Sequence, residues 1–189
     1  MNQRQRLRDL LLERSVKRGD FVLASGARSS YYVDCRTTST SAEGQVLIGA
    51  VGLELVRSSG LQPEVIGGLT MGADPVAYAI AHASWGSDGG PLDAFSVRKQ
   101  PKDHGTGKRV EGNFGAGQRA LVIEDVITSG GSALQACEAV EAEGGTVVGV
   151  LALIDREEGG RERIEERGYP VVTAFRISEL LAETADQSA

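Results

Sequence analysis

Short apolar runs that alternate with helix-forming segments place the strongest constraint on how this chain can fold. Apolar runs of strand length occupy residues 65–66, 94–97, 120–123, 146–154 and 171–175. Segments with helical character separate or follow them, at residues 42–58, 75–83, 132–143, 160–166 and 178–183. Strands joined through helices need right-handed crossovers, which produce a mostly parallel sheet covered on both faces. The sequence therefore predicts an α/β fold whose ligand site lies at the carboxyl ends of the strands.

The first forty residues do not follow this alternation. Leucines at helical spacing predict an amphipathic helix over about residues 3–17 that stops at Gly19. Two short strand-like runs, at residues 21–24 and 31–34, are joined by a polar turn and predict a hairpin-like arrangement. We expect one domain over residues 1–189, in which about 1–40 form a separate N-terminal segment and about 41–189 form the core.

Composition excludes several classes of protein. The net charge of −6 and the pI near 5.0 argue against a nucleic-acid partner, because such binding depends on Lys and Arg side chains. Cys35 and Cys137 belong to no zinc or disulfide spacing pattern and are expected to be free thiols in a reducing compartment. The longest apolar segment, residues 147–154, is too short to span a bilayer. We therefore expect a cytoplasmic protein with no membrane partner.

The run LVIEDVITSGGSA, residues 121–133, carries the clearest chemical information. An apolar strand brings two adjacent carboxylates, Glu124 and Asp125, to its carboxyl end, and a loop of Thr, Ser and Gly then opens a helix. Free backbone N–H groups, hydroxyls and the positive end of the helix suit a phosphate monoester. The acidic pair suits vicinal ribose hydroxyls or Mg²⁺. Together they predict a phosphorylated sugar as ligand.

Two other phosphate-binding motifs are excluded. Residues 107–109 read Gly-Lys-Arg, whereas a P-loop needs Ser or Thr after the lysine. Residues 115–117 read Gly-Ala-Gly but precede a strand, whereas a dinucleotide fingerprint follows one. The alternative interpretation of residues 121–133 is a capped helix after a buried strand, with solvated acids and no ligand.

The same run resembles the phosphoribosyl-diphosphate binding motif of the type I phosphoribosyltransferases. The resemblance implies that Glu124 and Asp125 contact the ribose hydroxyls, with Asp125 catalytic, and that the following loop wraps the 5′-phosphate. The implied binding stretch is Glu124, Asp125, Val126, Ile127, Thr128, Ser129, Gly130, Gly131 and Ser132. It also implies a mostly parallel central sheet flanked by helices, with a small hood built from the N-terminal segment. The implied cofactor is Mg²⁺, held mainly by the substrate diphosphate and water rather than by protein ligands.

Residues 98–108 form a long polar stretch with four Lys or Arg side chains and one of the two histidines of an otherwise acidic chain. A solvated surface loop is the alternative interpretation. The pattern Arg-Lys-x-x-Lys-x-His-Gly resembles the mobile catalytic loop of orotate phosphoribosyltransferases, which closes over the diphosphate in the neighbouring subunit of a homodimer. The resemblance implies diphosphate contacts, some from the partner subunit, by Arg98, Lys99, Lys102 and His104. Of these, Lys102 and His104 are the implied catalytic residues.

Three further stretches agree with the orotate family. The strand ending at Asp155 is followed by Arg156, which can grip a carboxylate through a bidentate fork. The resemblance implies that Arg156 and Thr128 bind orotate; the alternative for Arg156 is pairing with Glu157 or Glu158. Residues 23–34 resemble the hood, and residues 67–75 resemble the loop under the diphosphate. Lysines found in some family members are absent here, at Ala24 and around Met71.

The implied activity is Mg²⁺-dependent transfer of the 5-phosphoribosyl group from its diphosphate donor to orotate, which yields orotidine 5′-monophosphate in pyrimidine synthesis. Two alternatives stay open at this point. One is a purine-type phosphoribosyltransferase, and the other is a non-catalytic regulator that binds the same donor. The cationic stretch at residues 98–108 favours an enzyme over a regulator.

Overall fold

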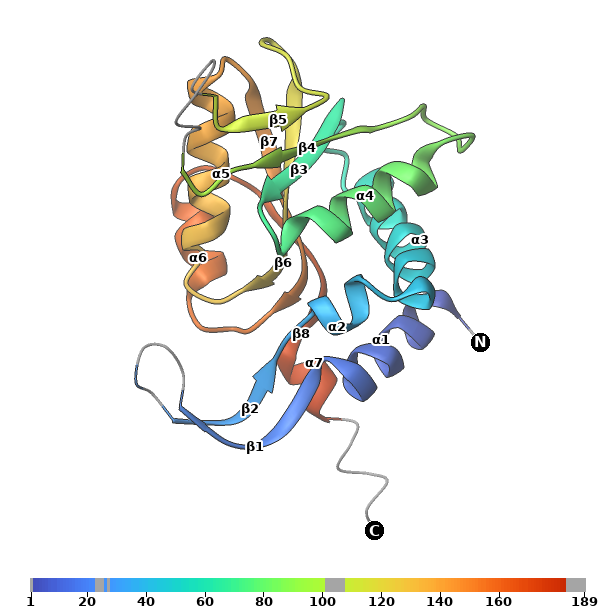
Figure 1. The fold of residues 1–189 in the computed structure, drawn as a ribbon, viewed down its shortest axis with the longest axis vertical. Helices are drawn as coiled ribbons and strands as arrows, with labels where there is room; N and C mark the ends of the chain where they lie inside the picture. Colours follow the sequence, from blue (N-terminus) through green and yellow to red (C-terminus); the bar gives the residue numbers. More distant parts are fainter. Residues whose placement is uncertain (1, 23–25, 27, 101–107, 183–189) are drawn as a thin grey trace.

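The centre of the molecule is a six-stranded sheet with the strand order β5-β4-β3-β6-β7-β8 (Figure 1). The computed structural model describes residues 2–22, 26, 28–100 and 108–182. The strands are β3 (Val65–Leu69), β4 (Asp93–Val97), β5 (Val110–Gly112), β6 (Arg119–Ile127), β7 (Thr146–Asp155) and β8 (Val171–Arg176). Neighbouring strands run parallel except for the pair β4 and β5. The predicted mostly parallel sheet is therefore confirmed.

Helices cover both faces of this sheet. On one face lie α1 (Gln3–Arg14), α3 (Ala42–Ser58) and α4 (Ala73–Ser84); on the other lie α5 (Gly131–Ala142) and α6 (Gly160–Glu166). Strand β6 shows why the sequence reads as a continuous apolar run. Leu121 and Ile123 face the first layer and Ala120 and Val122 face the second, and all four are fully buried.

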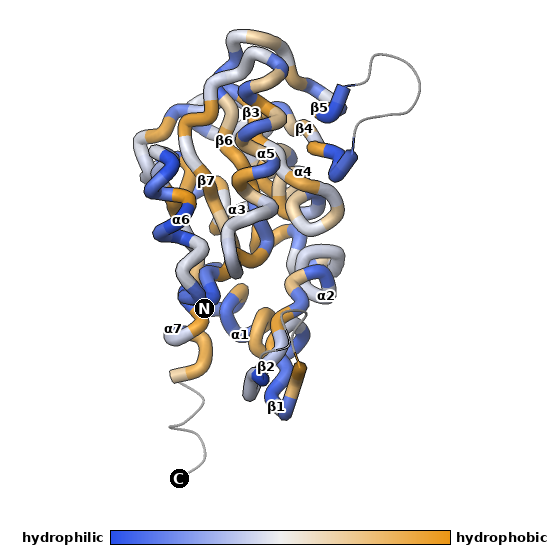
Figure 2. The backbone as a smooth tube through the Cα atoms, turned by 90° about the vertical axis from the view of Figure 1, so that its left-hand side faces the viewer, coloured by the Kyte–Doolittle hydropathy of each residue, from blue (hydrophilic) through white to orange (hydrophobic). Residues whose placement is uncertain are grey.

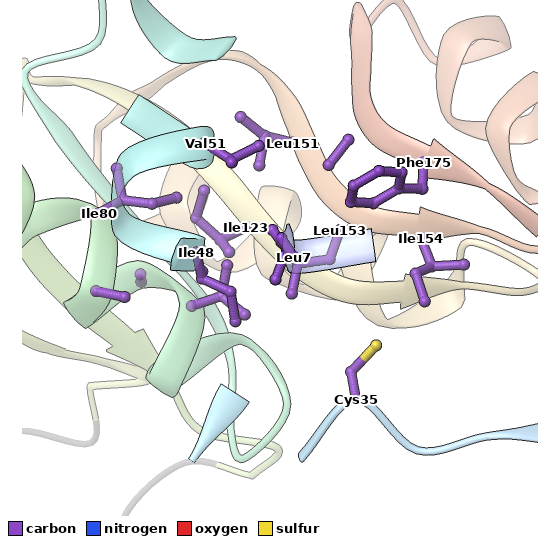
Figure 3. Close-up of a cluster of buried hydrophobic side chains, with 14 of the residues drawn as sticks. Leu7, Cys35, Ile48, Val51, Ile80, Ile123, Leu151, Leu153, Ile154 and Phe175 are labelled. Atoms are coloured by element: carbon purple, nitrogen blue, oxygen red, sulfur yellow. The ribbon is translucent and has the colours of Figure 1, made fainter. Parts of the chain in front are cut away.

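The core of the first layer joins segments that are far apart in the sequence. Side chains from α1, α3, α4, β6, β7 and β8 converge there, and Figure 3 shows the cluster extending from Ile80 through Ile48, Ile123 and Leu151 to Phe175. In Figure 2 the hydrophobic colouring is concentrated along β3, β6 and β7, between the two helical layers. This packing holds the central strands rigidly, so the residues at their carboxyl ends are fixed in position.

The N-terminal hairpin forms a small sheet of its own at one end of the molecule (Figure 1). Strands β1 (Val16–Val22) and β2 (Arg28–Val33) make a separate antiparallel sheet, which confirms the predicted hairpin. The helix predicted over residues 3–17 is too long: α1 ends at Arg14, and Val16 already pairs with Val33 of β2. The short helices α2 (Arg36–Ser39) and α7 (Ile177–Ala182) complete the chain.

Strand β1 begins at Val16, five residues before the strand expected at residues 21–24, and the other element boundaries agree with expectation to within a few residues. Pro75 lies in the first turn of α4, where its missing N–H costs little. The sequence missed α2 and β5, the second because three residues inside a polar, glycine-rich stretch show no periodicity. Within the described residues, none of the helices is both long and apolar enough to cross a membrane.

Candidate active site

A cavity of about 410 Å³ opens at the carboxyl ends of β3, β4 and β6, where the topology of a parallel sheet predicts a ligand site. It lies where the end of β6, the start of α4 and helix α2 come together (Figure 1). Its walls are formed by Arg36, Leu69, Thr70, Met71, Gly72, Lys99, Glu124, Asp125 and Ser132. The cavity thus combines two carboxylates, two cations, a short loop and the first turn of α5.

The acidic pair lies within strand β6, which continues for two more residues. Glu124 is buried, and burial together with the neighbouring charge of Asp125 raises the pKa of Glu124 well above its ordinary value. The backbone N–H of Val126 donates to Asp125 Oδ1 at 2.9 Å and fixes that carboxylate. A Cβ at Gly72 would lie 2.5 Å from the same Oδ1, so only glycine lets the loop of residues 70–72 approach so closely. The Asp125 carboxylate is therefore held in place against this loop.

Val126 and Ile127 belong to the sheet rather than to a loop. They pair with Ile154 and Asp155 of β7, and the Ile127 side chain is buried in the core. Of the implied binding stretch, these two side chains support the strand and do not line the cavity. The sequence placed the strand end too early because the acidic pair interrupts the apolar run.

The loop between β6 and α5 has the features of an anion cradle. Gly130, the N-cap of α5, has a φ of 74°, and a Cβ there would lie 2.7 Å from the carbonyl oxygen of Gly160. In the described part of the chain, the hydroxyls of Thr128, Ser129 and Ser132 make no hydrogen bond. Of the loop, only Ser132 lines the cavity itself. These hydroxyls and the first N–H groups of α5 are therefore available to a ligand.

Arg156 lies immediately after β7, and its side chain is only 7% exposed. Its guanidinium carbon is 5.0 Å from the ring centre of Tyr31 on β2. Nη2 lies 2.7 Å from Glu158 Oε1, so the pairing given as an alternative is present as an ion pair. Among the described residues, Nε is buried without a hydrogen-bond partner, and Nη2 has the Glu158 carboxylate as an ion-pair partner but no hydrogen bond. A buried guanidinium with unpartnered donors is a site for a carboxylate ligand.

The cationic stretch contributes one described side chain to the cavity, that of Lys99. Arg98 instead directs Nε to Glu111 of β5 at 3.0 Å, and its backbone N–H donates to the carbonyl of Arg109 at 2.8 Å. These contacts join the two ends of the stretch. Lys102 and His104 lie outside the described residues, as does Ala24.

Arg36 is the cavity residue that the sequence reasoning missed. It stands at the start of α2, in a segment without a recognised motif, and only the tertiary structure brings it to the site. A local pattern accompanies it: Asp34 and Arg36 are two residues apart and form a bidentate pair. In the sequence, an Asp and an Arg two residues apart, at the end of an expected strand, are the feature that could have indicated Arg36.

The buried carboxyl of Glu124 gives a prediction for stability. A raised pKa in the folded state favours the protonated form, so Glu124 destabilises the fold increasingly as the pH rises above the ordinary Glu pKa. Glu124→Gln removes this term, and we expect the melting temperature of the ligand-free variant, relative to wild type, to increase by about 2–4 °C between pH 5 and pH 8. Thermal melts at several pH values measure it, with the exposed Glu54→Gln as matched control. If the melting temperature of Glu124→Gln relative to wild type stays constant or falls as the pH rises, the raised pKa of Glu124 is contradicted.

Comparison with known proteins agrees with this geometry. A family model described as "Phosphoribosyl transferase domain" matches residues 48–175. The orotate phosphoribosyltransferase of Aquifex aeolicus is 47% identical over 96% of this chain and 99% of its own length. The chain belongs to the orotate phosphoribosyltransferases. The resemblance to the orotate phosphoribosyltransferases is thus confirmed for the chain as a whole.

Two further members of the family support the same assignment over nearly the whole chain. The orotate phosphoribosyltransferase of Rhodopirellula baltica is 44% identical over 89% of both chains. The crystal structure of the Mycobacterium tuberculosis orotate phosphoribosyltransferase in complex with 5-phospho-α-D-ribosyl 1-diphosphate superposes with a TM-score of 0.80. That enzyme is 40% identical, with 95% of this chain and 99% of the other covered. The orotate family assignment therefore rests on both sequence and fold.

Proposed function

We propose that this chain catalyses the reaction for which its family is named. The 5-phosphoribosyl group passes from 5-phospho-α-D-ribose 1-diphosphate to a ring nitrogen of orotate, and the products are orotidine 5′-monophosphate and diphosphate, in pyrimidine synthesis. The bond from ribose C1 to the diphosphate oxygen breaks as the bond from C1 to nitrogen forms, and the proton of that nitrogen passes to the departing diphosphate or to water. The observation that carries the proposal is the buried guanidinium of Arg156, which its single ion pair to Glu158 does not fully satisfy and which suits the orotate carboxylate.

The ribose and its 5′-phosphate are assigned to the end of β6 and the loop after it. Glu124 and Asp125 accept hydrogen bonds from the two ribose hydroxyls, because both carboxyl groups line the cavity and that of Asp125 is fixed there. The hydroxyls and N–H groups of residues 128–132 surround the 5′-phosphate. Positive charge develops on the ribose in the transition state, and the adjacent carboxylate of Asp125 stabilises it.

Orotate is assigned to the space between the end of β7 and the N-terminal hairpin. Arg156 binds the carboxylate, Tyr31 packs against the Arg156 guanidinium, and Thr128 at the start of the phosphate loop contacts the pyrimidine. The segment of about residues 1–40 then acts as a hood over the base. These groups hold the attacking nitrogen in line with C1, which supplies much of the rate enhancement through orientation.

The diphosphate is assigned to the cations at the other carboxyl ends of the sheet. Lys99 lines the cavity, and Arg98, Lys102 and His104 belong to the same stretch, in part acting on the partner subunit of a homodimer. No described group of three His, Cys, Asp or Glu side chains could hold a metal by itself. Mg²⁺ is commonly bound by one or two carboxylates together with substrate phosphates, so Glu124 and Asp125 fit a Mg²⁺ carried by the diphosphate. When bound, Mg²⁺ neutralises charge on the leaving group.

Direct assay of the purified chain tests the proposed reaction. With the diphosphate donor and Mg²⁺ present, we expect orotate absorbance to fall and orotidine 5′-monophosphate to appear. Adenine, hypoxanthine and uracil are the control bases, because the site has a carboxylate-binding arginine that none of them would use. Turnover of one of these bases in place of orotate, or donor binding without any turnover, would reject the proposal in favour of a purine enzyme or a regulator.

A further inference from the structure

The described residues that line the cavity include as many carboxyl groups as cations, although the site must hold a negatively charged diphosphate. Two carboxyl groups, Glu124 and Asp125, face the cavity, and the described cations that face it are Arg36 and Lys99. The loop of residues 70–72 also lines the cavity, but it consists of Thr, Met and Gly and therefore contributes no positive charge. A diphosphate leaving group needs concentrated positive charge close to its oxygens. Arg36 is in position to supply part of it.

Arg36 is held in a fixed orientation by Asp34. Its Nε lies 2.8 Å from Asp34 Oδ1 and its Nη2 lies 2.9 Å from Oδ2, so the two groups form a bidentate fork. The backbone N–H of Arg36 also donates to Oδ1 at 3.1 Å. The guanidinium holds the pKa of Asp34 below its ordinary value, so this carboxylate stays ionised over the working pH range. The orientation of Arg36 is therefore set before any ligand arrives.

The fork leaves most of the Arg36 guanidinium free for a ligand. A guanidinium has five N–H donors, and Asp34 accepts from two of its nitrogens, Nε and Nη2. The Nη1 group makes no hydrogen bond to the described residues, and the side chain is 52% exposed. An arginine oriented by one carboxylate and open on its other edge is suited to bind phosphate oxygens in pairs.

The helix that carries Arg36 is tied to the diphosphate side of the cavity. Gln45 of α3 donates from Nε2 to two carbonyl oxygens, that of Ser39 at the end of α2 and that of Pro75 in the first turn of α4, the latter at 2.8 Å. Helix α4 begins directly after the loop of residues 70–72. One amide group thus links α2 to the element that follows this loop, which keeps Arg36 beside it.

We propose that Arg36 binds the diphosphate group of the donor and supplies the positive charge that the loop of residues 70–72 lacks. This assignment rests on the proposed function, because it takes the donor of that reaction as the ligand. The remaining parts of the substrates already have assigned partners: the acidic pair for ribose, residues 128–132 for the 5′-phosphate and Arg156 for orotate. The diphosphate is the remaining part of the donor, and Arg36 and Lys99 are the described cations that line the cavity.

Binding measurements with fragments of the donor test this assignment separately from catalysis. Isothermal titration of Arg36→Met with diphosphate and Mg²⁺ should show affinity about 10- to 100-fold weaker than wild type. Binding of ribose 5-phosphate, which lacks the diphosphate, should change by less than about twofold, since it is held by residues 128–132. Arg36→Lys should fall between Met and wild type, because it keeps the charge but loses the fork.

The matched control is Arg6→Met, which removes another arginine paired with a carboxylate, Glu43 on α3, outside the cavity. It should bind both fragments as wild type does. Equal weakening of diphosphate and ribose 5-phosphate by Arg36→Met, or unchanged diphosphate binding, would overturn the assignment. Failure of the wild type to use orotate would reject the proposed function and leave this binding result standing on its own.

Discussion

Replacing Arg156 with Met should lower kcat/KM for orotate by about two to three powers of ten while leaving the KM of the diphosphate donor nearly unchanged. The physical reason is the state of the guanidinium without ligand: among the described residues, Nε is buried without a hydrogen-bond partner and Nη2 has only the ion pair to Glu158. A carboxylate that enters satisfies both at once, and a buried charged pair of this kind contributes strongly to binding. Steady-state kinetics with each substrate varied in turn measures the two effects.

The same substitution should not weaken the ligand-free fold. A buried guanidinium with unsatisfied donors is unfavourable, and the ion pair to Glu158 offsets only part of the penalty. We therefore expect Arg156→Met to melt at or above the wild-type temperature, as is common where a site is kept strained for function. Arg176→Met, at the exposed end of the neighbouring strand β8, is the matched control and should leave kinetics unchanged. A donor KM that rises as much as the orotate KM would place Arg156 elsewhere in the reaction.

The core of the fold could be predicted from the sequence because strands that are covered by helices on both faces are apolar along their length. Residues 120–123 are apolar without alternation since they are covered on both faces, and together with the alternation of strands and helices this pattern indicates a parallel sheet. The acidic pair and the following loop were found by their order: strand, carboxylates, small residues, helix. Within that loop, Gly130 has a positive φ of 74°, which glycine adopts readily.

What the sequence could not predict depends on tertiary contacts. Strand β5 is three residues long and exists because Val97 pairs with Val110, a contact that leaves no local periodicity. Helix α1 ends early because Val16 finds a partner in Val33. Arg36 shows the same limitation at the site, since nothing near it in the sequence indicates that Gln45 fixes its helix beside α4. The residues of the cavity that were found belong to motifs, and the one that was missed is brought there by packing.

Replacing Lys102 with Ala should lower kcat by about two powers of ten or more, with a smaller effect on donor binding. The reason is the timing of the charge: negative charge on the diphosphate grows as its bond to ribose breaks, so a cation beside it stabilises the transition state more than the ground state. Lys102 lies outside the described residues, and this prediction comes from its place in the cationic stretch. Turnover equal to that of wild type would show that the stretch has another role.

If the chain forms the proposed homodimer, a mixed dimer decides whether Lys102 acts on the partner subunit. Co-expression of Lys102→Ala and Arg156→Met chains with different tags allows the heterodimer to be purified. If the lysine acts across the interface, one site of the heterodimer has an intact Arg156 and an intact Lys102, whereas the other has neither. Its turnover should then be about half that of the wild-type dimer, because a two-fold assembly has two equal sites. If each lysine serves its own subunit, every site carries one substitution and the heterodimer should be as inactive as its parents.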